Sequence, residues 1–119
     1  MSVWQTLSKI DVNKHTEKKG NLTYLSWAWA WAVTKEHYPE ANYVFVDNEI
    51  HADGTMTVHC EVSIETVNHE MWLPVMDNRN KAIKNPDAFA INTAKMRCLT
   101  KGLSMHGLGA YIYAGEDLP

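Results

Sequence analysis

One segment, from Thr55 to Val67, alternates strictly between apolar and polar side chains, and it constrains the possible fold more than any other. A period of two predicts a strand with one buried face. The inward-facing residues would be Met56, Val58, Cys60, Val62 and Ile64.

The flanking segments predict two more strands. Asp53-Gly54 is a hairpin turn signal, and Tyr43 to Ile50 before it is typical of a strand. A third strand is expected after Asn68, through Met71 to Val75, with Pro74 marking an edge or the strand's end. Together these strands predict an antiparallel meander.

A long helix should follow the sheet. Asp87 is a suitable N-cap, and Gly107 and Gly109 would end the helix at about His106. A helical projection gives two apolar stripes on nearly opposite sides. We expect the first to cover the sheet and the second to contact another subunit, because one small sheet cannot bury both. The first stripe holds Phe89, Met96, Leu99 and Leu103, with Asn92 within it, and the second holds Ile91, Ala94, Cys98 and Met105.

A polar stripe runs between them and holds Thr93, Arg97, Thr100, Lys101 and Ser104. Arg97 and Lys101 are one turn apart and flanked by hydroxyls, which suits a row of phosphates. A solvated helix face is an alternative explanation. The basic loop before the helix favours phosphate binding, since it adds Arg79, Lys81 and Lys84. Neither Arg97 nor Lys101 is expected in the core.

The N-terminal part predicts two helices separated by a polar loop. The first helix would span Val3 to Ile10, and the loop Asn13 to Asn21. The second would span Tyr24 to Tyr38, because Ser26 is a plausible N-cap and Pro39 lies just past the end. At the other end of the chain, Ala110 to Tyr113 is expected to add a short strand.

Three tryptophans mark the second helix. Trp27 and Trp31 would share one face and Trp29 another, so this helix should pack on two sides. Core or subunit contacts are the favoured role for these rings, and stacking on DNA bases is the alternative.

Length and composition indicate one folded domain over residues 1–119. The order of the expected helices and strands predicts the α+β class. No stretch has the length and apolarity of a membrane span, and Met1 to Asp11 lack the features of a signal peptide, so we expect a cytoplasmic protein. Cys60 and Cys98 fit reduced core residues.

The net charge is −3, yet the segment from Arg79 to Lys101 carries six cations and one acid, or +5. A local cluster of cations of this kind binds phosphate even when the net charge of the chain is negative.

Motifs for nucleotide hydrolysis are missing. The glycines give neither a phosphate-binding loop nor a dinucleotide fingerprint, and no serine or cysteine nucleophile constellation is evident. A metal site can be imagined from His59, Glu61 and His69, although a solvated sheet face is the stronger explanation. We therefore expect no enzymatic activity, no cofactor and no metal.

Two blocks of sequence resemble a known family. They are Tyr24-Leu25-Ser26-Trp27-Ala28-Trp29-Ala30-Trp31 and Asn92 to Lys101, followed by Gly107-Leu108-Gly109 and the run from Ala110 to Pro119. Together they resemble a phage family of single-strand annealing proteins, of the type called Sak-three and formerly described as a domain of unknown function. That family resembles the eukaryotic recombination protein Rad fifty-two.

The resemblance implies a curved sheet crossed by a long helix, assembled into rings or filaments with DNA in a basic groove. It implies ATP-independent annealing of complementary strands in phage recombination and repair, in the cytoplasm of a bacterial host. Single-stranded DNA and annealed duplex intermediates would be the ligands, and a phage exonuclease or single-strand-binding protein could be a partner. Members of such families often continue into a C-terminal tail that recruits partners. The DNA-binding residues are assigned from charge and helix geometry: Arg79, Lys81, Lys84, Thr93, Arg97 and Lys101.

Two other functions stay open at this point. The first is a DNA-binding adaptor that uses the same basic segment without annealing. The second is a metal-dependent nuclease built on His59, Glu61 and His69.

Overall fold

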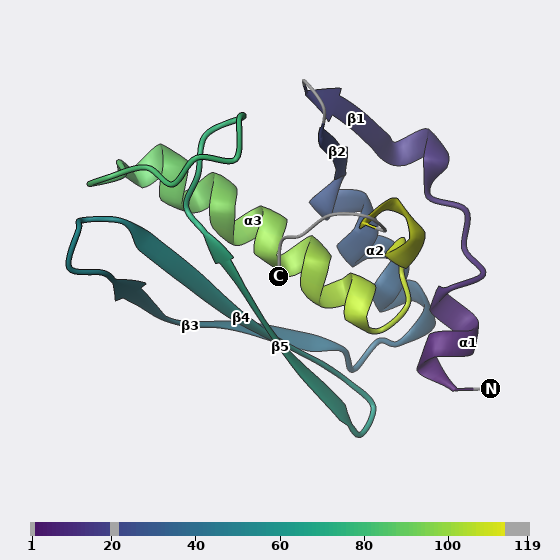
Figure 1. Cartoon of the computed structure of the whole chain (residues 1–119). Coiled ribbons are helices and arrows are strands. Elements are labelled where there is room, and N and C mark those ends of the chain that lie inside the picture. Colours follow the sequence, from purple (N-terminus) through teal and green to yellow (C-terminus); the bar gives the residue numbers. More distant parts are fainter. Residues whose placement is uncertain (1, 20–21, 114–119) are drawn as a thin grey trace.

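The computed structural model describes residues 2–19 and 22–113 (Figure 1). The end of the last block of the family resemblance, Ala114 to Pro119, lies outside the described residues, as do Gly20 and Asn21. In chain order the elements are α1 (Val3–Leu7), η1 (Asn13–His15), β1 (Thr16–Lys19), β2 (Leu22–Leu25), α2 (Trp27–His37), β3 (Asn42–Ile50), β4 (Met56–Ile64), β5 (Val67–Pro74), α3 (Ala88–Met105) and η2 (Ala110–Tyr113).

The predicted meander is confirmed. Strands β3, β4 and β5 form an antiparallel sheet in that order, with β4 in the centre. Of the five predicted inward residues of β4, Val58, Cys60, Val62 and Ile64 are fully buried, and Met56 is partly buried. A register shift between Val46 and Glu49 adds an irregularity to β3 that the sequence pattern did not predict.

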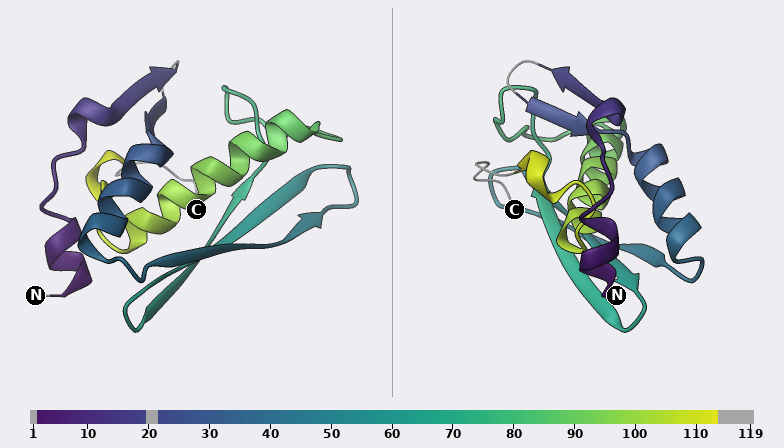
Figure 2. Two further views of the ribbon diagram at one scale, coloured as in Figure 1. Left: turned by 180° about the vertical axis from the view of Figure 1, so that it is seen from behind. Right: turned by 90° about the vertical axis from the view of Figure 1, so that its right-hand side faces the viewer.

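Helix α3 crosses one face of this sheet, as expected (Figure 2). Its N-cap is Asp87, whose carboxylate accepts the Ala90 amide at 2.8 Å. The helix ends at His106, and Gly107 follows with φ of +117°. A Cβ at Gly107 would lie 3.0 Å from the Trp4 carbonyl oxygen, so both the backbone angle and the close approach of α1 favour glycine there.

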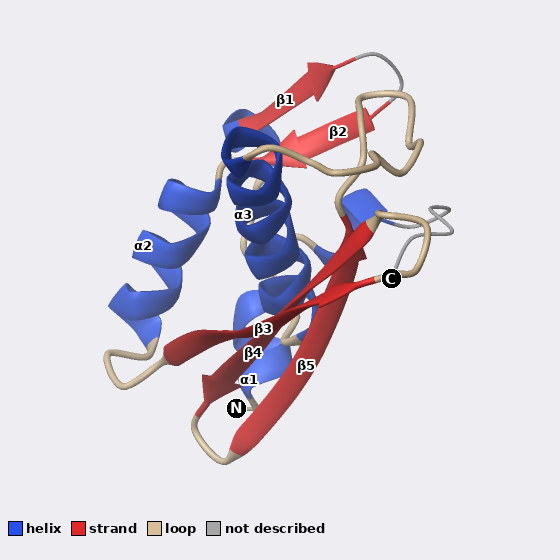
Figure 3. Cartoon of the chain, turned by 90° about the vertical axis from the view of Figure 1, so that its left-hand side faces the viewer, coloured by secondary structure: helices blue, strands red, loops and turns tan. Residues whose placement is uncertain are grey.

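The two apolar stripes of α3 were assigned to the wrong sides. Ala94 and Cys98 of the second stripe face the sheet, and the Cys98 Sγ lies 3.3 Å from the Met71 carbonyl oxygen. Leu99 and Leu103 of the first stripe are fully buried at a different angle around α3, beside which α2 packs (Figure 3). Projection could not decide between the stripes, because both are apolar and the second helix that covers one of them comes from far away in sequence.

Helices α1 and α2 confirm the two predicted N-terminal helices, and the Ser26 hydroxyl accepts the Trp29 amide at 3.3 Å. The predicted bounds were too wide, because α1 ends at Leu7, and Tyr24 and Leu25 belong to strand β2. Trp29 and Trp31 contact different neighbours: Trp29 stacks on His15 at 3.9 Å, and Trp31 meets Tyr43 edge-on at 4.8 Å. The expectation that α2 packs on two sides is thus confirmed. Its most deeply buried residues are nevertheless Ala30 and Thr34, not the tryptophans.

Two local predictions were wrong. The expected polar loop over Asn13 to Asn21 contains η1 and β1, and β1 pairs with β2 in an antiparallel hairpin. This strand has a polar sequence because backbone pairing to β2 alone holds it. The expected strand at Ala110 to Tyr113 is a 3₁₀ helix, since its amides bond locally, as the Ile112 amide does to the Gly109 carbonyl at 3.1 Å.

Candidate nucleic-acid interface

A groove of about 640 Å³ opens between the β1–β2 hairpin and α3. Its floor is the side of α3 that faces away from the sheet, and its far wall is the segment Met76 to Asn78. Trp27 at the start of α2 and Tyr113 of η2 also line it. The arrangement of hairpin above helix is visible in Figure 3. From α3 come Asn92, Thr93, Met96, Arg97, Thr100 and Lys101.

Arg97 is held in the groove by an aromatic ring. Its guanidinium lies over the Tyr24 ring, 4.7 Å from the centroid, and Tyr24 belongs to strand β2. Within residues 2–19 and 22–113, no carboxylate forms an ion pair with Arg97. A cation positioned by a ring keeps its charge available for an anion, because the ring does not neutralise it.

Lys101 is also in the groove, but it is buried. Only 4% of its surface is exposed, so the expectation that it stays out of the core was wrong. Its Nζ lies 4.2 Å from the centre of the Tyr113 ring. The Tyr113 hydroxyl donates to the Thr100 Oγ1 at 3.2 Å, and the Thr100 hydroxyl donates to the Arg97 carbonyl at 2.8 Å. Helix η2 therefore covers this part of the helix surface.

The polar stripe of α3 is thus divided. Thr93 is exposed, Arg97 is half-buried, and Thr100 and Lys101 form a deeper part of the groove floor. Ser104 does not line the groove, and its hydroxyl donates to the Lys101 carbonyl at 2.6 Å. Of the residues predicted to bind DNA, three lie together here: Thr93, Arg97 and Lys101.

The other three predicted residues, Arg79, Lys81 and Lys84, belong to the loop that leads from the groove wall to α3. They are exposed and do not line the groove itself. Asp77 shapes this loop: its Oδ1 accepts the amides of Lys81 at 3.0 Å and Arg79 at 2.8 Å. These backbone hydrogen bonds lower the pKa of the Asp77 carboxyl below its usual value.

The sequence patterns did not predict the hairpin wall, because β1 falls in the expected loop Asn13 to Asn21, and Tyr24 and Leu25 of β2 fall in the expected helix Tyr24 to Tyr38. It contributes Lys14, Thr16 and Thr23 to the groove, together with one acid, Glu17. Hydroxyls and cations on two facing walls suit a sugar-phosphate backbone, which is bound by positive charge and small donors. The local surplus of lysines at Lys14, Lys18 and Lys19 was the signal that could have pointed to it.

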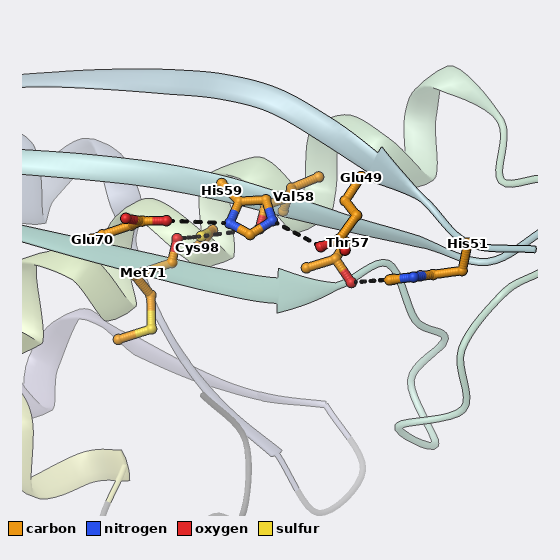
Figure 4. Close-up of polar contacts among 8 residues, drawn as sticks. All are labelled: Glu49, His51, Thr57, Val58, His59, Glu70, Met71 and Cys98. Atoms are coloured by element: carbon orange, nitrogen blue, oxygen red, sulfur yellow. Dashed lines mark hydrogen bonds and ion pairs between the residues drawn. The ribbon is translucent and has the colours of Figure 1, made fainter.

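The imagined metal trio is not brought together. His59 and Glu61 lie on the outer face of the sheet, whereas His69 lies on the inner side, with its ring 4.6 Å from that of His106 on α3. His59 instead lies between Glu49 and Glu70, at 3.2 and 3.6 Å (Figure 4). In the part of the chain that the structure describes, no group of three or more histidines, cysteines or carboxylates is arranged to hold a metal ion.

The family comparison agrees with this geometry. The profile of a protein family described as Sak Single Strand Annealing Protein matches residues 2–119. The chain belongs to the Sak single-strand annealing family. This confirms the resemblance found in the sequence and associates the Sak chain with binding and annealing of single-stranded DNA. No curated protein matches it. Among the described residues, no helix of this Sak protein has the length and apolarity needed to cross a membrane.

Proposed function

We propose that this Sak protein holds single-stranded DNA in the groove between the β1–β2 hairpin and α3. The observation that carries the proposal is the half-buried Arg97 guanidinium on the floor of a groove of about 640 Å³, with the buried Lys101 one helical turn away adding positive charge beneath the floor. Thr93 and the hairpin hydroxyls would add small donors to the phosphates. Arg79, Lys81 and Lys84 would extend the cationic path along the adjoining loop.

Annealing follows from holding the backbone instead of the bases. Cations that neutralise phosphates lower the repulsion between two strands and order each of them, while base edges stay free to pair. Base pairing then supplies the driving force, so neither ATP nor a divalent metal is required. This mechanism supports a role without bond chemistry in recombination and repair of phage DNA, within the cytoplasm of the host bacterium.

We further propose that the protein works as a homo-oligomer, in a ring or a filament. Several large apolar side chains are exposed at separate places on the surface, including Trp4, Met105 and Val67 around a depression of about 310 Å³. Apolar patches of this kind mark contacts with other proteins. A phage exonuclease or a single-strand-binding protein is the class of partner that would supply or occupy its DNA.

The proposal is tested by annealing two complementary oligonucleotides with the wild-type chain and two variants. The variants are Arg97→Gln and, as a control, Lys9→Gln, which changes an exposed cation just after α1 and outside the groove. We expect annealing by the wild type without ATP and in the presence of a chelator. Arg97→Gln should slow annealing and flatten the salt dependence of binding by roughly 0.7 in the log–log slope, the value for one lost phosphate contact. Lys9→Gln should change neither.

Three results would contradict the proposal. DNA binding with annealing at the spontaneous rate would favour the adaptor, and strand cleavage abolished by a chelator would favour the nuclease. An unchanged salt slope in Arg97→Gln would show that Arg97 binds no phosphate in this groove.

A further inference from the structure

Phe89 is the most exposed large apolar side chain of the described residues. It lies in the first turn of α3 and is 82% exposed, whereas Leu99 and Leu103 further along the helix are fully buried. Exposing an aromatic ring to water costs free energy. A ring this open therefore points to a ligand or a partner that covers it.

The position of Phe89 on α3 indicates which ligand. Met96 and Thr100 follow it by seven and eleven residues, so all three lie on one side of the helix. Met96 and Thr100 belong to the groove floor, and so do Asn92 and Thr93, which lie between them and Phe89. Phe89 thus continues the floor of the groove toward the N-terminal end of α3, where the loop with Arg79, Lys81 and Lys84 ends.

Three other aromatic rings in or near the groove already have a partner on one face. Arg97 covers Tyr24, Lys101 covers Tyr113, and His15 covers Trp29. Trp27 lines the wall and is about half as exposed as Phe89. Within the described part of the chain, neither a ring nor a cation contacts Phe89. An open ring is a surface on which a nucleobase stacks, since every base has an aromatic face.

We propose that Phe89 stacks on a base of the bound strand where the strand leaves the groove. This inference rests on the proposed binding of single-stranded DNA in that groove. Phosphate contacts along the floor leave the strand free to slide, whereas a stacked base fixes one nucleotide relative to the protein. Phe89 is therefore a positioning residue for the strand, with no preference for one base.

The experiment compares binding of a labelled oligonucleotide with binding of a strand of the same length whose sugars carry no bases, for the wild type, Phe89→Leu and Phe89→Trp. Trp72→Leu is the matched control, because Trp72 is 48% exposed on the outer face of the sheet. Phe89→Leu should weaken binding of the normal strand roughly 5- to 100-fold, the range for losing one stacked base. Phe89→Leu should bind the base-free strand as tightly as the wild type does. The salt slope should not change, and Phe89→Trp should bind the normal strand as the wild type does.

Equal losses on both strands, unchanged affinity for the normal strand, or a change in oligomer size by light scattering would overturn the inference. The last of these would assign Phe89 to a contact between subunits. Failure of the proposed function itself looks different: the wild type would then bind neither strand, or would bind without dependence on salt.

Discussion

At the scale of single residues, burial decides which side chains keep their charge. His106 is buried against the sheet, and its Nε2 lies 2.8 Å from the Val62 carbonyl oxygen. The carbonyl can only accept, so Nε2 carries the proton and donates. Burial lowers the pKa of His106 below its usual value, and the nearby His69 lowers it further, although the hydrogen bond to Val62 acts in the opposite direction.

This neutral histidine predicts a loss of stability in mild acid. The unfolded chain binds a proton at the ordinary histidine pKa, whereas folded His106 binds one only at lower pH, so the free energy of unfolding falls as pH drops below about 6.5. His106→Gln keeps a donor for Val62 and cannot titrate. Urea unfolding at a series of pH values from 8 to 5 should therefore give a flatter profile for the variant. Parallel profiles would show that His106 is not the group responsible.

Lys101 marks the limit of prediction from sequence at this scale. A helical projection places it correctly beside Arg97 on a polar stripe, and both residues do line one groove. Its burial depends on Tyr113, which arrives from the next element, and no periodicity within α3 contains that information.

At the scale of elements, the sequence predicted most of what has a regular period. The meander, the Asp87 cap and α2 with its Ser26 cap all follow from alternation, helical spacing or capping residues. The β1–β2 hairpin could not be found in this way, because its short polar strand has no buried face to give a pattern. Since this hairpin is one wall of the groove, sequence patterns could not predict that wall of the candidate site.

The contact between α3 and β4 is close because small residues lie between them. A Cβ added to Gly102 would be 2.7 Å from the Val62 Cγ2, nearer than packed atoms allow. We expect Gly102→Ala to destabilise the fold by about 1–2 kcal/mol, since the clash outweighs the better helix propensity of alanine. Chemical unfolding measures this change.

The matched test uses Val62→Ala, which removes the opposing methyl groups. In that background Gly102→Ala should cost less than it does alone, and the difference is a coupling energy between the two positions. Equal costs in both backgrounds would mean that the strain lies elsewhere than at Val62.

At the scale of the whole molecule, charge and apolar surface are unevenly distributed. Between Lys35 and Arg79 the chain contains no lysine or arginine and nine acids, and this stretch includes the whole three-stranded sheet. The cations lie before and after it, and most of them belong to the elements that build the groove or to its adjoining loop. The folded protein therefore has an acidic sheet on one side of α3 and a basic groove on the other.

The exposed apolar residues predict assembly beyond a dimer. Ile50 is exposed at one end of the three-stranded sheet, and the depression lined by Trp4, Val67 and Met105 lies at the other. Surfaces at opposite ends join head to tail, which repeats until a ring closes or a filament extends. Light scattering at micromolar concentration, with and without DNA, should report a species well above a dimer. A monomer under both conditions would contradict this expectation.

The salt concentration decides whether the carboxylates of the acidic sheet repel DNA that lies in the groove. Even the shortest dimension of the molecule is 22 Å, whereas the screening length is about 8 Å at physiological salt and about 30 Å at 0.01 M. At physiological salt, a strand in the groove is therefore shielded from the carboxylates behind the sheet, and the net charge of −3 does not oppose its binding. In very dilute buffer the same carboxylates act through the whole thickness of the protein, so lowering the salt further brings progressively less gain in affinity.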